Sequence, residues 1–137
     1  MNAPGDDGPG AVLRTALAPA AIGPYVQGRT GPLTGRWLVT SGQIGLDPKS
    51  GTIVEGGVAA ETERVITNLE AVLAAAGATL AHVVKTTVFL ADMSDFAAMN
   101  DVYAGRFPDP KPARTTIAAR ELPKSCRVEI EAWAFLG

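Results

Sequence analysis

The chain has 137 residues, of which 47% are apolar and 19% charged, so it is long enough to form one domain around a hydrophobic core and is not a disordered chain. Its formal net charge of -2 provides no overall attraction to nucleic acid or to an anionic membrane. No apolar run has the length needed to cross a bilayer, and the N-terminus lacks a basic segment leading into an apolar one. The sequence therefore predicts a cytoplasmic protein with no membrane partner.

Cysteine and histidine each occur once in the sequence. The single cysteine, Cys126, excludes an intramolecular disulfide and fits a reducing compartment. No histidine is near Cys126 in sequence, so we interpret this residue as the start of a strand with no catalytic role. Because His82 is the only histidine, a zinc site of the usual Cys/His kind cannot form within one chain, and we predict no metal site.

The N-terminal residues 1–10 are rich in glycine, proline and aspartate, a composition that predicts a flexible tail. Residues 37–42 mix aromatic, β-branched and small side chains after the turn-forming residues 31–35, which indicates a strand introduced by a hairpin. Ser41 and Gly42 make the end of this strand unusually small. Glycine there lets a ligand approach the backbone closely, although a simple bulge would require the same residue.

Two amphipathic helices are predicted from apolar residues that recur at three- and four-residue intervals. The first covers about residues 60–76, places Glu61 on its polar side and ends at Gly77. The second begins near Ser94 and is ended by the prolines that follow residue 107. Between the helices, residues 82–90 are rich in β-branched side chains and predict a strand buried on at least one face. The apolar stripes comprise Val65, Ile66, Leu69, Val72, Leu73 and Ala76 in the first helix, and Phe96, Met99, Val102, Tyr103 and Phe107 in the second.

Two further strands are predicted at residues 114–119 and 127–136. Alternate residues of the last strand place Val128 and Ile130 on one face and Trp133 and Phe135 on the other, so both faces have apolar groups. The order of the elements gives two right-handed crossovers that feed one sheet. Since helices are available for only one side, we predict that another copy of the chain covers the other side, which makes the protein a homo-oligomer.

Arg114 and Glu129 lie on these two consecutive strands, which we expect to be joined closely enough for the two side chains to pair. An arginine can hold a substrate carboxylate through two parallel hydrogen bonds, and a partly buried glutamate can move protons to or from water. The pair indicates hydrolysis or isomerisation of a small anion. The plainer alternatives are a solvated arginine at a strand start and a glutamate paired with Arg127 or Lys85 across the sheet.

Six segments, in this order and at suitable spacings, resemble the RidA family of reactive enamine and imine deaminases. The resemblance runs from about residue 18 to the C-terminus, so we divide the chain into a flexible N-terminal tail, residues 1–17, and a RidA-like domain, residues 18–137. The sequence contains no nucleotide-binding loop and no serine-hydrolase elbow, which argues against a nucleotide enzyme and a serine hydrolase. The matching segments are residues 18–27, 40–44, 68–73, 84–93, 112–115 and 128–132.

The resemblance implies a single domain with the chorismate-mutase-like α+β fold, in which two helices cover one face of a mixed, mostly antiparallel sheet. It also implies a homotrimer that packs its sheets inward, with ligand sites between subunits. The implied activity is hydrolysis of 2-imino acids and enamines, such as 2-aminoacrylate or 2-iminobutyrate, to 2-keto acids and ammonia without a metal or organic cofactor. The expected partner is therefore a small 2-imino or 2-keto acid, and not nucleic acid.

Position by position, the resemblance assigns three residues to catalysis. Arg114 matches the arginine that binds the substrate carboxylate, Glu129 matches the acidic residue that handles the water, and Tyr25 matches a tyrosine that lines the cleft. The backbone N–H of Gly42 matches one that meets the ligand.

Three more positions are candidates for substrate binding. Thr116 stands where family members often have cysteine, so thiol-dependent behaviour is not expected here. Ser41 and Asn100 are weaker candidates, because a small strand residue and an amide on a helix face both have ordinary structural uses.

Two other functions remain open at this point. The first is a non-catalytic protein of the same fold that binds small carboxylates or acts like a chaperone. The second is an endoribonuclease or translation inhibitor. The acidic balance of the chain argues against RNA, although five basic residues between positions 111 and 127 leave an opening.

Overall fold

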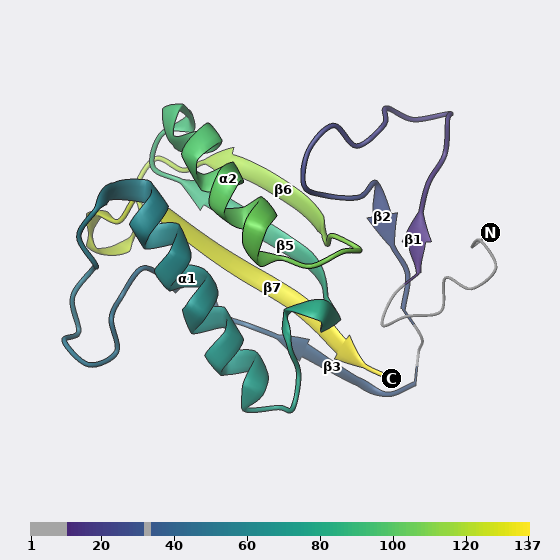
Figure 1. The fold of residues 1–137 in the computed structure, drawn as a ribbon, viewed down its shortest axis with the longest axis horizontal. Helices are drawn as coiled ribbons and strands as arrows, with labels where there is room; N and C mark the ends of the chain where they lie inside the picture. The colour runs from purple at the N-terminus through teal and green to yellow at the C-terminus, as the bar shows by residue number, and fades with distance from the viewer. Residues whose placement is uncertain (1–10, 32–33) are drawn as a thin grey trace.

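The computed structural model describes residues 11–31 and 34–137, which form a mixed sheet with two helices packed against it (Figure 1). Four strands have the order β3-β7-β5-β6, and β4 pairs with a further part of β7. β3, β4 and β5 run antiparallel to β7, whereas β5 and β6 are parallel. The mixed, mostly antiparallel sheet expected from the sequence is confirmed. The elements are β1 (Val12–Leu13), β2 (Gly28–Arg29), β3 (Arg36–Val39), β4 (Gln43–Ile44), α1 (Gly57–Ala74), β5 (Val83–Leu90), α2 (Phe96–Arg106), β6 (Ala113–Ala118) and β7 (Val128–Leu136).

The C-terminal end of α1 depends on one glycine. Gly77 has φ of 78°, a left-handed conformation that glycine adopts without steric cost. The N–H of Ala78 donates to the carbonyl of Leu73 at 2.9 Å, and the N–H of Gly77 donates to Ala74 at 3.0 Å. These two bonds form a Schellman motif, which satisfies carbonyls that the helix end would otherwise leave unpaired.

The C-terminal end of α2 is stabilised by a cation from the segment that follows it. Lys111 donates from Nζ to the carbonyl of Ala104 at 2.8 Å and also to that of Phe107. A positive charge is favourable at this end of a helix because the last carbonyls carry partial negative charge. Lys111 is therefore used in helix capping.

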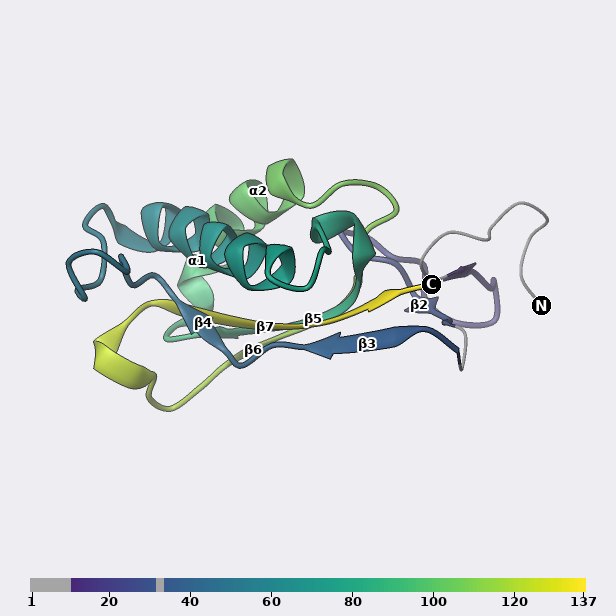
Figure 2. The same ribbon diagram turned by 90° about the horizontal axis from the view of Figure 1, so that it is seen from below.

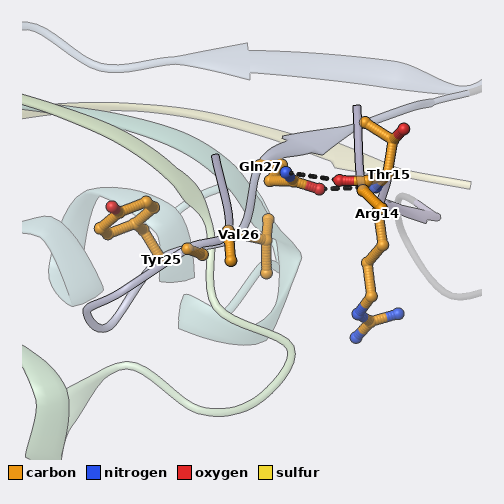
Figure 3. A pocket seen from close by; sticks show the side chains of 8 residues that line it. Arg14, Thr15, Tyr25, Val26 and Gln27 are labelled. Atoms are coloured by element: carbon orange, nitrogen blue, oxygen red, sulfur yellow. Dashed lines mark hydrogen bonds between the residues drawn. The ribbon is translucent and has the colours of Figure 1, made fainter. Parts of the chain in front are cut away.

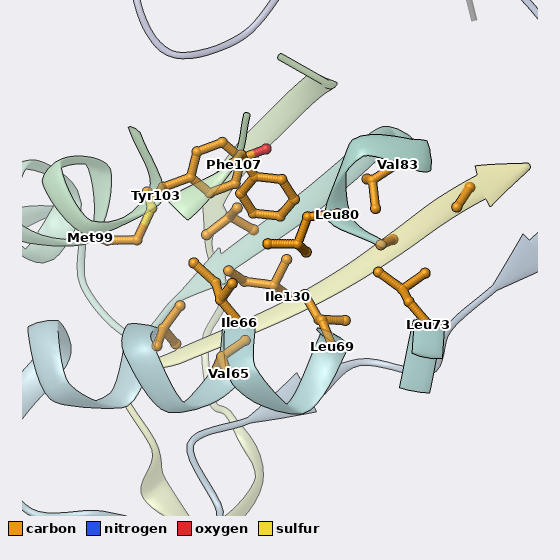
Figure 4. Packing of buried hydrophobic residues seen from close by; sticks show 14 of the residues in the cluster. Val65, Ile66, Leu69, Leu73, Leu80, Val83, Met99, Tyr103, Phe107 and Ile130 are labelled. Atoms are coloured by element: carbon orange, nitrogen blue, oxygen red, sulfur yellow. The ribbon is translucent and has the colours of Figure 1, made fainter. Parts of the chain in front are cut away.

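The hydrophobic core lies between the two helices and the helix-facing side of the sheet (Figure 4). Burying each of its large aliphatic side chains is worth about 1.5–3 kcal/mol relative to exposure in water. Tyr103 of α2 and Phe107, which directly follows the helix, stack at 4.3 Å between ring centroids. The Tyr103 hydroxyl forms a 2.7 Å hydrogen bond with Thr86 of β5. Core residues include Val65, Ile66, Leu69, Leu73, Val83, Val88, Leu90, Met99, Val128 and Ile130.

Both helices cover the same face of the sheet, and the opposite face lies open (Figure 2). Trp37 and Trp133 belong to this open face and are 50% and 45% exposed. Their rings meet edge to face at 6.2 Å, and the Trp37 ring contacts Phe135 at 4.9 Å. Ile117 of β6 adds a third large apolar side chain, 46% exposed. An exposed aromatic cluster such as that of Trp37 and Trp133 is unusual on the surface of a monomer.

Several sequence expectations differ from the structure. β3 pairs with β7 rather than with a preceding hairpin strand, and residues 32–33 of the expected turn lie outside the described residues. Val72 is 42% exposed and does not belong to the core. Glu61, expected on the polar side of its helix, is buried, and its Oε1 accepts the N–H of Arg127 at 2.8 Å.

The first described residues also differ from the expectation. β1 pairs with β2, and Val12 is buried, so a strand lies within the stretch 1–17 that was expected to be a flexible tail. Residues 1–10 of that stretch lie outside the described residues. Within the described part of the chain, neither helix combines the length and the apolar character needed to span a bilayer.

Candidate active site

Arg114 lies under α2, on the helix-facing side of β6. It is in register with Thr86 of β5, and paired residues in a parallel sheet point to the same face. Its guanidinium donates from Nη1 to Oδ1 of Asn100 at 2.8 Å. Its Cζ atom is 4.8 Å from the ring centroid of Tyr103 and 5.5 Å from the centroids of Tyr25 and Phe96. The cation is thus enclosed by three aromatic rings and one neutral amide.

The charge of Arg114 is not neutralised by any residue that the structure describes. Among the described residues, no carboxylate forms an ion pair with it. Burial lowers the pKa of Arg114, while the phenolic groups of Tyr103 and Tyr25 oppose this shift. A half-buried guanidinium that keeps its charge without an anionic partner is suited to bind an anion from solution.

Tyr25 reaches Arg114 from a loop that precedes β2. The next residue, Val26, forms a parallel bridge with Ala113, and its N–H donates to the carbonyl of Pro112 at 3.2 Å. The Tyr25 hydroxyl accepts the N–H of Ile22 at 3.3 Å. A hollow of about 360 Å³ opens between this loop and the start of β6, and Tyr25, Lys85 and Arg114 contribute to its wall.

Glu129 and Gly42 form a second group of candidate residues. Glu129 is in register with Ile44 of β4 and with Phe89 of β5. A Cβ atom placed on Gly42 would lie 2.3 Å from Oε2 of Glu129, so the carboxylate rests directly over this glycine. Ser41 is exposed beside it. The small residues predicted to end the strand therefore leave room for the Glu129 carboxylate.

The two groups do not meet within one chain. β5 lies between β6 and β7, so the expectation that the strands of Arg114 and Glu129 are close enough to pair is wrong. Phe89, the register partner of Glu129, alternates with the buried core residues of β5, and this places Glu129 on the open face. Arg114 lies on the helix-facing side. Strands that are consecutive in sequence are separated here because β7 returns to the centre of the sheet.

Thr116 stands two residues after Arg114, on the same face of β6. Within the described residues, its Oγ1 atom is buried and has no hydrogen-bond partner. An unsatisfied hydroxyl of this kind costs about 1–3 kcal/mol unless another molecule completes the bond. The hydroxyl of Thr116 therefore has hydrogen-bonding capacity that the described residues do not use.

Sequence reasoning missed the aromatic surroundings of Arg114. Phe96 and Tyr103 were assigned to the apolar stripe of a helix, and both also face the guanidinium. Burial raises the pKa of Tyr103 to about 12, so its hydroxyl stays protonated and bonded to Thr86 rather than serving as a base. The one available signal was a tyrosine within an otherwise apolar stripe, since a buried hydroxyl needs a partner.

Cys126 and His82 have structural surroundings. Cys126 is buried, and burial raises the pKa of its thiol, with Glu61 and Glu129 raising it further. A thiol with a raised pKa is a poor nucleophile. His82 Nδ1 accepts the N–H of Thr79 at 3.0 Å and caps a short 3₁₀ turn. In the described part of the chain, no three His, Cys, Asp or Glu side chains cluster as a metal site would require.

Comparison with known proteins identifies the family. The family model described as endoribonuclease L-PSP matches residues 15–136. A 2-iminobutanoate/2-iminopropanoate deaminase from Capra hircus is 49% identical over 126 residues, which cover 92% of this chain and 90% of the relative. The structure of RidA from an Antarctic Psychrobacter is 39% identical with a TM-score of 0.72, and covers 91% of this chain and 98% of its own. Escherichia coli TdcF with bound serine is 36% identical with a TM-score of 0.71, covering 92% of this chain and 98% of its own. With the sequence motifs and the fold in agreement, the chain belongs to the RidA family.

Proposed function

We propose that this protein is a hydrolytic deaminase that converts 2-iminobutanoate, 2-iminopropanoate and their enamine tautomers to 2-keto acids and ammonia. Relatives that carry this name are 48–49% identical to the chain over 92% of its length. The structural observation that supports the activity is the unneutralised, half-buried Arg114 beside the unpaired hydroxyl of Thr116. Both groups suit a small substrate with one carboxylate. The cytoplasmic location expected from the sequence stays a prediction.

The complete site is proposed to form between copies of the chain. Arg114, Tyr25 and Asn100 would come from one subunit, and Glu129, Gly42 and Ser41 from the open side of its neighbour. This assignment follows from the opposite faces on which Arg114 and Glu129 lie, and from the exposed apolar face around Trp37 and Trp133. The assembly we propose is the homotrimer with sheets packed inward and with the chorismate-mutase-like architecture.

In this site Arg114 grips the substrate carboxylate and places the adjacent C=N carbon, with Thr116 and the N–H of Gly42 as further donors. Glu129 gives a proton to the imine nitrogen and orients a water molecule toward the carbon. The water oxygen forms a C–O bond, the C–N bond of the tetrahedral intermediate breaks, and ammonia leaves as C=O forms. One water is consumed for each ammonia released. Such positioning and proton transfer contribute about 10²–10⁴-fold, and the chain needs no nucleophile for it.

The activity is tested by generating 2-aminoacrylate or 2-iminobutyrate with a dehydratase and following 2-keto acid formation. We expect the protein to accelerate this step beyond the uncatalysed hydrolysis. An unchanged rate with every imine offered, together with 2-keto acid binding by calorimetry, would instead support the non-catalytic carboxylate-binding alternative.

The endoribonuclease alternative rests on the description of the family model. Three of the five basic residues that left this possibility open have separate roles in the structure. Lys111 caps α2, Arg127 pairs with Asp95 at 2.5 Å, and Arg114 faces Asn100. Since they form no shared track for a phosphate backbone, we expect no salt-dependent RNA binding, which a filter-binding titration at two salt concentrations checks.

Asn100→Asp is expected to weaken the binding of 2-keto acids about tenfold or more. The new carboxylate keeps the hydrogen bond to Arg114 but neutralises the charge that binds the ligand. Calorimetry with pyruvate and with the uncharged pyruvamide measures the effect. We expect the loss of affinity for pyruvate and no loss for pyruvamide. Ala97→Glu adds the same charge at an exposed position of α2 and is the control. Unchanged pyruvate affinity in Asn100→Asp contradicts the prediction.

Gly42→Ala is expected to lower kcat/KM about 10–10²-fold while the melting temperature changes little. The added methyl group would occupy the space of the Glu129 carboxylate, whose flexible end can move aside at small cost in stability. Gly105→Ala is the matched control, because nothing lies within 4 Å of a Cβ atom there. Full activity in Gly42→Ala would show that the position of the carboxylate does not matter.

A further inference from the structure

The side-chain amide of Gln27 connects two ends of the loop that carries Tyr25. Its Oε1 accepts the N–H of Thr15 at 2.7 Å, and its Nε2 donates to the Thr15 carbonyl at 3.1 Å. Nε2 also lies 3.3 Å from the carbonyl of Ala18 and 2.7 Å from that of Pro19. Figure 3 shows this amide between Thr15 and the chain that continues from Tyr25.

Little apolar burial holds the same loop in place. Leu17 is 98% exposed and Ile22 is 90% exposed, so neither side chain anchors the loop within the subunit. A loop with few buried apolar contacts opens easily unless hydrogen bonds fix it. The contacts of Gln27 span 8 to 12 residues of sequence and close the loop at its base.

The loop also reaches Arg114. A Cβ atom on Gly23 would lie 3.1 Å from the Tyr25 ring and 3.9 Å from Nη2 of Arg114, so this part of the loop packs against the guanidinium. Gln27 and Tyr25 both contribute to the wall of the hollow beside Arg114. The position of the Tyr25 ring over the cation therefore depends on how the base of the loop is held.

We infer that Gln27 is a positioning residue that holds Tyr25 over Arg114 and so fixes one wall of the substrate site. The inference rests on the proposed function for its catalytic consequence. Three of the four contacts of Gln27 end at carbonyl oxygens, which accept and cannot donate. The position thus requires an NH₂ donor as well as an acceptor. A carboxylate of the same shape supplies the acceptor but no donor.

The test is a double-mutant cycle with Gln27→Glu and Tyr25→Ala, which removes the ring that faces Arg114. The glutamate keeps the shape and the acceptor for Thr15 but faces three carbonyls without a donor. Gln27→Glu is expected to lower kcat/KM about tenfold in the wild-type background and less than about twofold when Tyr25 is already alanine, because coupled residues are non-additive. Gln27→Met removes the same donor without adding charge and is used if the glutamate variant does not fold. Arg14→Gln, at an exposed residue of the same segment, is the control.

Amide hydrogen exchange of residues 15–25 supplies a readout that needs no turnover. We expect faster exchange in Gln27→Glu and in Gln27→Met, with the core strands unchanged. Equal fold-losses in both backgrounds, or unchanged exchange in the loop, would overturn the inference and leave Gln27 as an ordinary structural contact. If the wild type has no deaminase activity, the proposed function fails, whereas the exchange result still decides whether Gln27 holds the loop.

Discussion

Arg114→Ala is expected to reduce kcat/KM for 2-imino acids about 10²–10³-fold with the fold intact. Arg114 provides a half-buried cation whose hydrogen-bond partner is a neutral amide, so its charge is available to the substrate carboxylate. Removing one partner of a desolvated charge pair typically costs about 2–5 kcal/mol. We expect most of the loss as a raised KM, since the carboxylate is bound in both the ground state and the transition state.

Two variants make the Arg114 experiment specific. Arg114→Lys retains the charge but not the planar fork, and we expect it to recover only part of the activity. Arg120→Ala removes an exposed cation just beyond the end of the same strand and is expected to leave the rate unchanged. Equal rates for wild type and Arg114→Ala would exclude Arg114 from the reaction.

Glu129→Gln is expected to lower kcat about 10²–10⁴-fold, because the amide cannot donate or accept the proton exchanged with the imine nitrogen and water. The KM should change less, since Glu129 is assigned no contact with the carboxylate. Measuring kcat and KM separately with 2-iminobutyrate checks that the loss lies mainly in kcat. A wild-type kcat in Glu129→Gln would remove the residue from the mechanism.

Mixing the two inactive proteins tests the shared site directly. If Arg114 and Glu129 act from neighbouring subunits, co-refolding equal amounts of Arg114→Ala and Glu129→Gln leaves about one site in four with both native residues in a cyclic oligomer. The mixture should therefore recover about a quarter of the wild-type rate, while each variant alone stays inactive. If every site were built within one chain, the mixture would remain as inactive as its components.

The sequence predicted the helices, most of the strands and the open apolar face because each depends on local periodicity. The apolar stripe around Leu69 and the β-branched run around Val88 specify an element and its buried face without reference to the rest of the chain. It did not predict that β5 separates β6 from β7, because strand order is set by non-local pairing that leaves no periodic trace. For this reason the expected pairing of Arg114 with Glu129 inside one chain was wrong.

The individual site residues came from family resemblance, and the contacts between them came from the structure. Asn100 was a weak candidate in the sequence, since an amide on a helix face is commonplace, and its bond to Arg114 depends on the packing of α2 over β6. Gln27 and Glu61 were missed because their partners are backbone groups. Backbone donors and acceptors occur at almost every position, so no sequence pattern indicates which of them a side chain will meet.

The neutral surroundings of Arg114 also affect how the protein behaves in a mixture of metabolites. The reaction changes only the C=N group, so the keto acid produced keeps the same anionic handle by which its precursor was captured. Accumulated product, and other compact monocarboxylates such as acetate or lactate, would compete for the same guanidinium. Turnover in a cell would then fall as keto acids build up, and assays in acetate buffer would underestimate the rate.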